Sequence, residues 1–169
     1  MRIGIVCYPT FGGSGVIATE LGMALAGKGH EIHFITYNLP VRLDFISHNL
    51  HFHEVLMEEY PLFQYQPYEL ALSTKLVEVV AKYQLEILHV HYAIPHAYAA
   101  FMAKKMLNEK GIDVKVVTTL HGTDITLVGS HPSYKTAVEF SINNSDHVTS
   151  VSKSLQQDTL RLFSINKDI

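Results

Sequence analysis

The sequence predicts an α/β protein built on one parallel β-sheet with helices on both faces. Short apolar runs that suit buried strands alternate along the chain with longer segments whose apolar residues recur at helical spacing. A turn rich in glycine joins the first of these strands to the first helix. There is no internal repeat, low-complexity stretch or domain boundary, so the 169 residues are expected to form one domain.

The elements follow one another in regular order. Residues 2–7 form an apolar strand, and the helix expected at 14–28 ends in the stop signal Gly27-Lys28-Gly29. A second strand is expected at 31–36, and the alternating residues 50–55 predict a third strand at a sheet edge. Further strands are expected at 87–91, 114–120 and 147–151, and further helices at 68–83, 94–110, 134–143 and 152–163, with irregular segments at 56–67 and 121–133.

Composition narrows the class of function. Hydrophobic residues make up 47% of the chain and charged residues 17%, as in a globular protein with a core. Thirteen basic and sixteen acidic side chains give a net charge of −3 without a block of like charge, so nucleic acid is not expected as a partner. No apolar run reaches the about 18 residues that a membrane span requires, so no membrane partner is expected.

The single cysteine indicates a compartment. Cys7 has no second cysteine to pair with and lies in the first strand, where burial is expected. The chain starts directly with this strand, without the basic and apolar pattern of a secretory leader. We therefore expect a cytoplasmic protein. Whether it forms a homo-oligomer is left open by the sequence.

The turn between the first strand and the first helix is a candidate anion site. It contains Gly12, Gly13, Ser14 and Gly15. The first amides of a helix lack partners within the helix and attract negative charge, and glycine lets a ligand approach the main chain closely. The alternative is that these glycines serve only tight packing of the turn.

Polar clusters follow four of the predicted strands. They lie at residues 8–15, 37–44, 91–96 and 121–124. Because ligands of parallel sheets bind at the carboxyl ends of the strands, we expect the clusters to converge on one site.

Eleven histidines raise the question of a metal. His89 and His91 share one face if residues 87–91 form a strand. The chain has no His-Glu-x-x-His motif and no paired cysteines, which metal sites often show. The sequence therefore predicts no metal ligand set and no cofactor.

Several segments together resemble the N-terminal domain of a known enzyme family, the retaining glycosyltransferases of family 4. This family has the GT-B architecture, which consists of two Rossmann-like halves. Matching segments run from about residue 3 to residue 168, and the combination of His-Val-His-Tyr-Ala-Ile-Pro-His with His-Gly-Thr-Asp is the most specific part. The segments are 7–9, 12–15, 29–36, 52–55, 63–68, 88–96 and 118–126.

The resemblance implies a substrate pair and a division of labour. The likeness is greatest to members that transfer N-acetylglucosamine from UDP-N-acetylglucosamine to L-malate in bacillithiol biosynthesis. Residues 1–169 would form the Rossmann-like acceptor-side domain. The C-terminal nucleotide-sugar domain, which carries most donor contacts, would be absent, and the chain alone would lack full activity.

The resemblance also suggests roles for individual residues. His121 matches the family's histidine beside the reacting carbon, with a structural loop histidine as the alternative. Gly12, Gly13 and Gly15 are candidates for the donor diphosphate, although an acceptor carboxylate would suit the same amides. Asp124 is a further donor-side candidate, and it would serve equally well to orient His121 or to cap the loop.

A pocket for malate needs hydroxyl groups and a cation. Ser14, Tyr92 and Thr119 supply hydroxyls at the expected strand ends. Lys75 and Arg42 are the candidate cations, and arginine would grip a carboxylate with two hydrogen bonds. Both side chains would equally suit an ordinary solvated surface.

Two other functions stay open at this stage. One is a family 4 transferase with a different acceptor. The other is a non-enzymatic nucleotide-binding module, which is disfavoured because Thr36-Tyr37-Asn38 stands where a ribose-binding acid is usual.

Overall fold

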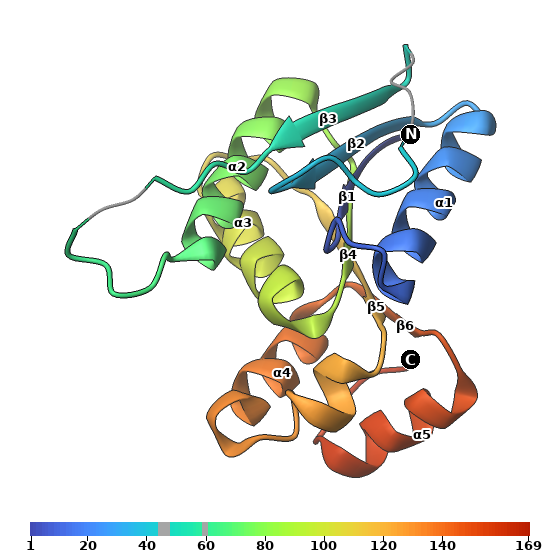
Figure 1. Cartoon of the computed structure of the whole chain (residues 1–169), viewed down its shortest axis with the longest axis vertical. Coiled ribbons are helices and arrows are strands. Elements are labelled where there is room, and N and C mark those ends of the chain that lie inside the picture. The colour runs from blue at the N-terminus through green and yellow to red at the C-terminus, as the bar shows by residue number, and fades with distance from the viewer. Residues whose placement is uncertain (44–47, 59–60) are drawn as a thin grey trace.

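The computed structural model describes residues 1–43, 48–58 and 61–169 and forms one six-stranded sheet, as Figure 1 shows. The strand order is β3-β2-β1-β4-β5-β6, and every neighbouring pair is parallel. This confirms the α/β prediction and places β3 at an edge. The strands are β1 (Arg2–Val6), β2 (Glu31–Thr36), β3 (Leu50–Glu54), β4 (Ile87–His91), β5 (Lys115–Leu120) and β6 (His147–Ser150).

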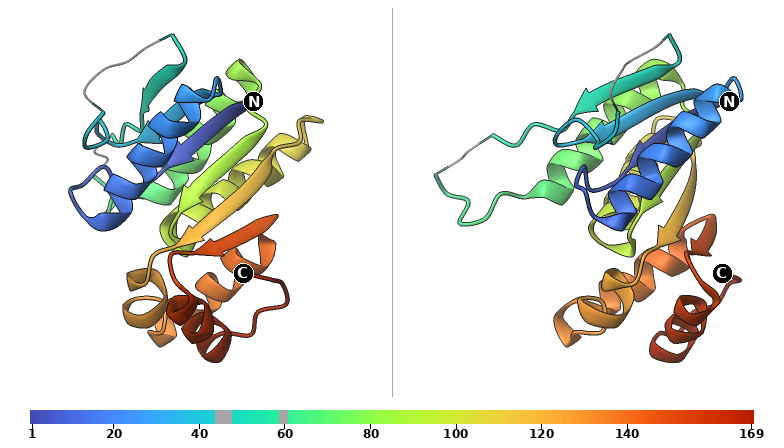
Figure 2. Two further views of the ribbon diagram at one scale, coloured as in Figure 1. Left: turned by 90° about the vertical axis from the view of Figure 1, so that its right-hand side faces the viewer. Right: turned by 45° about the vertical axis from the view of Figure 1, so that its right-hand side comes forward.

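Helices cover both faces of this sheet. Helix α1 lies on one face, and helices α2 and α3 lie side by side on the other (Figures 1 and 2). In the described parts of the chain, no helix has both the length and the apolar character needed to cross a bilayer. The helical segments are α1 (Gly13–Gly27), α2 (Tyr68–Tyr83), η1 (Ala93–Ala97), α3 (Tyr98–Asn108), η2 (Thr123–Leu127), α4 (Pro132–Asn144) and α5 (Lys153–Leu162).

Alternation along the strands builds a core on each side of the sheet. Ile5 and Phe34 belong to the cluster with α1, whereas Val6 and Ile35 belong to the cluster with α2 and α3. Neighbouring residues of a strand point to opposite faces, so strands that are apolar at nearly every position are buried on both sides. Cys7 is fully buried, as expected.

Two segments differ in detail from the prediction. The helix expected at 94–110 is broken near its start, because Ile94 is extended (φ −132°, ψ 141°) before Pro95. A residue that precedes proline is disfavoured in the α region by a steric clash. The segment 121–133, expected to be irregular, contains the single helical turn η2.

Gly22 is required for the close approach of α1 to the sheet. A Cβ at this position would lie 2.4 Å from Cζ of Phe34 and 2.9 Å from Cδ1 of Ile5, and both side chains are fully buried. We expect Gly22→Ala to lower the free energy of unfolding by about 1–3 kcal/mol, the usual cost of overpacking a core. Urea unfolding of the purified protein measures this difference.

Gly27 in the same helix provides the matched control. A Cβ there would meet nothing within 4 Å. Gly27→Ala should leave the stability unchanged or raise it by up to about 1 kcal/mol, since alanine favours helix. Equal effects of the two substitutions would contradict the packing argument.

Candidate functional site

A cleft of about 600 Å³ opens at the carboxyl ends of the central strands. It lies among the residues that follow β1 and β4, the start of α2, the segments η1 and η2, and α4. Aromatic rings dominate its wall, and two carboxylates are the acidic groups. The tyrosines are Tyr8, Tyr68, Tyr92, Tyr98 and Tyr134, and the acids are Glu69 and Asp124.

Tyr8, Tyr92 and His96 form an aromatic contact group in this cleft. The ring of Tyr8 lies 5.3 Å from that of Tyr92 and 4.6 Å from that of His96, measured between centroids. Burial raises the pKa of the Tyr8 hydroxyl to about 12, so the hydroxyl keeps its proton at neutral pH. The end of β1 is thereby joined to the end of β4.

The backbone of Tyr92 is strained. Its φ of 85° and ψ of 135° lie in a region that residues other than glycine rarely adopt. The Tyr92 N–H donates to the Thr119 carbonyl at 3.0 Å, and the Ala97 N–H donates to the Tyr92 carbonyl at 3.2 Å. Backbone strain of this kind is concentrated at functional sites. Here the strained conformation of Tyr92 changes the direction of the chain directly after β4.

Asp124 joins the two loops of the site. Its Oδ2 accepts the Ala93 N–H at 2.9 Å, and its Oδ1 accepts the N–H groups of Gly122 at 3.0 Å and His121 at 3.2 Å. Burial raises the pKa of the carboxyl although these donors act in the opposite direction. Both carboxylate oxygens thus accept backbone N–H groups. This favours the alternative in which Asp124 caps the loop over a direct contact with the sugar donor.

His96 has a defined tautomer. Its Nδ1 donates to the His91 carbonyl at 2.5 Å, so Nε2 carries the lone pair and accepts the Tyr68 hydroxyl at 3.4 Å. Burial lowers the pKa of His96 to about 4, so the ring is neutral at physiological pH.

His121 is oriented by a second buried histidine. Its Nε2 lies 2.8 Å from Nδ1 of His91, so one ring donates to the other. Nε2 of His91 is buried and has no hydrogen-bond partner among the described residues. A buried N–H without an acceptor is rarer and more costly than a bare lone pair, so we infer that His91 donates from Nδ1.

This assignment leaves the proton of His121 on Nδ1, where it is free to act as a donor. Burial lowers the pKa of His121 to about 4 and that of His91 to about 2, with the neighbouring histidines adding to the shift. Both rings are therefore neutral at physiological pH. The ring of Tyr92, which lines the cleft, lies 5.2 Å from that of His121, which is not among the described residues that line it.

The glycines of the turn differ in their surroundings. A Cβ at Gly15 would lie 2.3 Å from the Thr10 carbonyl oxygen and 2.5 Å from that of Tyr8, so this glycine serves tight packing. A Cβ at Gly13 would meet nothing within 4 Å. Within the described parts of the chain, no acceptor takes the amides of Gly13, Ser14 and Gly15, so they are available to an anion.

The remaining candidates are dispersed. Thr119 bonds His89 at 2.7 Å and Thr149 at 2.8 Å, which joins three neighbouring strands. Lys75 pairs with Glu78 at 3.0 Å beside a separate hollow. Arg42 pairs at 3.0 Å with Glu20 of α1, and its side chain is 55% exposed. Neither cation is among the described residues that line the cleft.

Sequence reasoning missed several residues of the site. His96, Tyr68, Tyr98 and Tyr134 were not proposed, although His96 belongs to the quoted motif. Tyr68 is the first residue of α2, and the position of a helix start relative to the strand ends does not follow from the sequence pattern. Asp44, part of the cluster expected after the second strand, lies outside the described residues.

Residues 11–169 match Glycosyltransferase Family 4, and the chain belongs to this family. A curated relative, the N-acetyl-alpha-D-glucosaminyl L-malate synthase of Bacillus anthracis, is 56% identical over all 169 residues. The chain spans 44% of the length of that relative.

Solved structures share the fold. A glycosyltransferase from Rickettsia africae ESF-5 aligns with 98% of the chain and 40% of its own, at a TM-score of 0.69 and 21% identity. UDP-GlcNAc 2-epimerase from Methanocaldococcus jannaschii aligns over 95% of this chain and 42% of its own length, with a TM-score of 0.61 and 12% sequence identity. The architecture is thus that of one Rossmann-like half of a GT-B glycosyltransferase.

The buried histidines should make the protein sensitive to mild acid. Burial lowers the pKa values of His89, His96 and His121 to about 4, so the unfolded chain binds more protons than the folded one below about pH 6.5. Stability is complete above that pH and falls as the pH drops. Between about pH 6.5 and pH 5 we expect the free energy of unfolding to fall by more than about 1.4 kcal/mol per pH unit, which is the slope for uptake of one proton.

Urea unfolding at a series of pH values measures this slope, and two variants serve as references. His96→Gln should reduce the slope by about one proton. Substitution of the exposed His147 by glutamine should leave it unchanged. A wild-type slope below one proton would contradict the neutral state of the buried rings.

Proposed function

We propose that the chain is the acceptor-side half of a retaining glycosyltransferase that transfers N-acetylglucosamine from UDP-N-acetylglucosamine to L-malate in bacillithiol biosynthesis. The observation that carries this proposal is the 56% identity over the whole chain to the synthase from Bacillus anthracis. Two structural features support it: the backbone N–H groups at the start of α1, and the ring of His121, which His91 orients.

L-malate presents two carboxylates and one hydroxyl to the protein. The amides of Gly13 and Ser14 at the start of α1 suit one carboxylate, because a helix N-terminus favours negative charge. The Ser14 and Tyr92 hydroxyls supply additional donors. Lys75 and Arg42 contribute only if their ion pairs with Glu78 and Glu20 break, which makes the backbone amides the stronger candidates.

His121 is proposed to contact the transferred sugar. With its Nε2 held by His91, a neutral ring presents Nδ1–H as a hydrogen-bond donor. Such a donor fixes a sugar hydroxyl beside the anomeric carbon as the bond to the diphosphate breaks, and a fixed geometry lowers the barrier of group transfer. Asp124 acts indirectly, since it holds the loop that carries His121.

The uridine and most diphosphate contacts are assigned to a second Rossmann-like half. The sugar would then lie between the two halves, where closure excludes water from the reacting bond. The proposal includes a cytoplasmic location for the enzyme.

The single cysteine is compatible with this location. Burial raises the pKa of the Cys7 thiol to about 12, so the thiol stays protonated in this fold.

Transfer activity tests the proposal directly. We would replace the matching part of the Bacillus anthracis relative with this chain and supply UDP-N-acetylglucosamine and L-malate. The joined protein should form the malate glycoside, and His121→Ala should lower kcat/KM by about 10²–10³-fold, as loss of a transition-state donor does. His147→Ala is the matched control and should leave the rate unchanged.

The outcomes separate the parts of the proposal. A folded joined protein that forms no malate glycoside, while the intact relative does, would overturn the malate assignment. Formation of a glycoside with another hydroxy acid in place of L-malate would retain the assignment as a family 4 transferase and replace the proposed acceptor. Equal rates for His121→Ala and wild type would remove His121 from the reaction.

Ligand protection tests the assignment of the halves. L-malate at millimolar concentration should raise the Tm of this chain, because a ligand that binds only the folded state stabilises it. Succinate, which lacks the hydroxyl, is the control and should have a smaller effect. A rise with UDP and none with L-malate would show that this half holds the nucleotide.

A further inference from the structure

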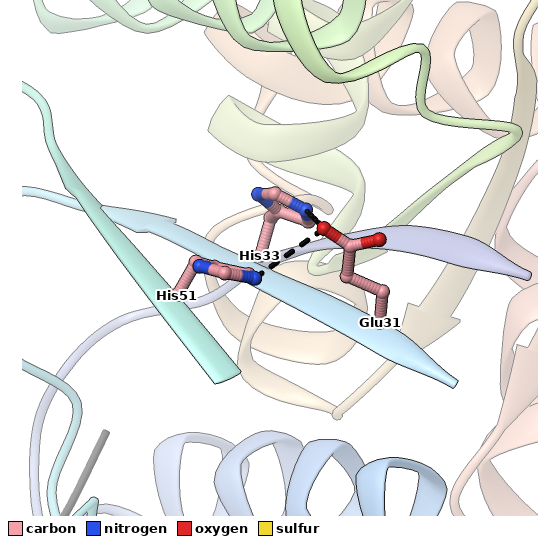
Figure 3. A group of neighbouring side chains, drawn as sticks. All are labelled: Glu31, His33 and His51. Atoms are coloured by element: carbon pink, nitrogen blue, oxygen red, sulfur yellow. Dashed lines mark hydrogen bonds and ion pairs between the residues drawn. The ribbon is translucent and has the colours of Figure 1, made fainter. Parts of the chain in front are cut away.

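A second group of titratable side chains lies at the opposite end of the sheet from the cleft. Glu31 and His33 come from the start of β2, and His51 comes from β3, directly across from His33 in the strand register. All three side chains share the face that α2 covers, as Figure 3 shows for their mutual arrangement. The proposed transfer reaction uses none of them.

The donor atoms of the group lie close together. Oε1 of Glu31 is 3.2 Å from Nε2 of His33 and 3.3 Å from Nε2 of His51. One possible ligand atom from each of the three residues lies within 4.8 Å of those of the other two. Two ligands of a tetrahedral zinc ion, each about 2.0–2.1 Å from the metal, are about 3.3 Å apart. The two distances from Oε1 of Glu31 to the histidine nitrogens therefore already match the spacing between two ligands of such an ion.

We propose that Glu31, His33 and His51 form a binding site for a first-row divalent metal ion, with zinc as the best fit. Two imidazoles and one carboxylate are ligands that zinc takes at about this spacing, and a water molecule would complete the tetrahedron. The ion would bridge β2 and β3, so its role is to fasten an edge strand to the sheet.

The charges of the group favour a cation. Glu31 contributes the carboxylate of the group, and the other two ligands are imidazoles. Arg2 lies opposite Glu31 in the register of β1 and β2, but its guanidinium bonds Gln84 at 3.0 Å. Among the described residues, the ion-pair partners of Glu31 are imidazoles alone.

His51 has a nitrogen available for a metal. Its Nε2 is buried and lies 3.3 Å from Oε1 of Glu31, without the geometry of a hydrogen bond among the described residues. The rings of His33 and His51 are stacked at 24° with centroids 4.5 Å apart, so metal binding requires a tilt that brings the two Nε2 atoms together. The His51 side chain is 32% exposed, and this tilt breaks no hydrogen bond of its Nε2.

His53 and Tyr83 support the proposed ligands. Nδ1 of His33 lies 2.8 Å from Nε2 of His53. Without metal, the Nε2–H of His33 donates to Oε1 of Glu31 at 3.2 Å, and a bound ion would replace this proton while Nδ1–H of His33 donates to His53. Metal-bound histidines usually donate their other N–H to a partner in this way. The ring of Tyr83 packs 4.7 Å from His33 and 5.0 Å from His53 and covers the group on the side of α2.

Titration of the metal-free chain with Zn²⁺ tests the proposal. We expect one equivalent to bind at neutral pH by calorimetry and to raise the Tm by several degrees. His51→Gln and Glu31→Gln should each weaken binding at least about tenfold and abolish the Tm shift. Circular dichroism and the Tm without metal establish that each variant is folded.

The chain offers a control against binding elsewhere. His147→Gln removes an exposed histidine from β6 and should leave the affinity unchanged. With Co²⁺ in place of zinc, the visible spectrum should show a tetrahedral ion in the wild type and in His147→Gln, and not in His51→Gln. Absence of binding, or equal binding by all variants, would overturn the proposal.

Discussion

The buried carboxylate of Asp124 is the interaction on which the site depends. It accepts backbone N–H groups from Ala93, after β4, and from His121 and Gly122, after β5. A charged group is buried at acceptable cost only when hydrogen bonds replace its water, and three backbone donors do so here. The two loops are thereby fixed relative to each other, and the strained turn at Tyr92 is maintained beside His121.

Neutral histidines serve both ends of the sheet. A neutral imidazole offers one donor and one acceptor and can be buried without a counter-ion. At the carboxyl end of β4, the buried His91 and His96 use this property to orient His121 and Tyr68. At the amino end of β2, His33 lies in a similar environment next to a carboxylate. The same chemistry therefore supports the orientation of His121 at one end and a proposed metal site at the other.

Several features could be predicted because they depend on local pattern. The apolar runs gave the strands, and the alternating residues of β3 placed it correctly at an edge. The glycine turn was recognised, but its two roles became separable only when the contacts around Gly15 and the open space at Gly13 were known. Lys75 and Glu78 are three residues apart on α2, so the helical pattern was enough to indicate their pairing. The partner of Arg42 lies on α1, 22 residues away in the chain, and could not be predicted.

By itself the sequence determined the fold class and the order of the elements. It also predicted that polar segments meet at the carboxyl ends of the strands, and residues that follow β1, β4 and β5 line the cleft there. These follow from periodicity and from the topology of parallel sheets, which need no knowledge of side-chain positions. Only the tertiary structure decided that Asp124 caps two loops, that His91 orients His121, and that Glu31 meets two histidines across two strands. Hydrogen-bond partners depend on atoms of residues far apart in the chain lying about 3 Å from each other to within a few tenths of an ångström, and linear spacing does not encode such precision.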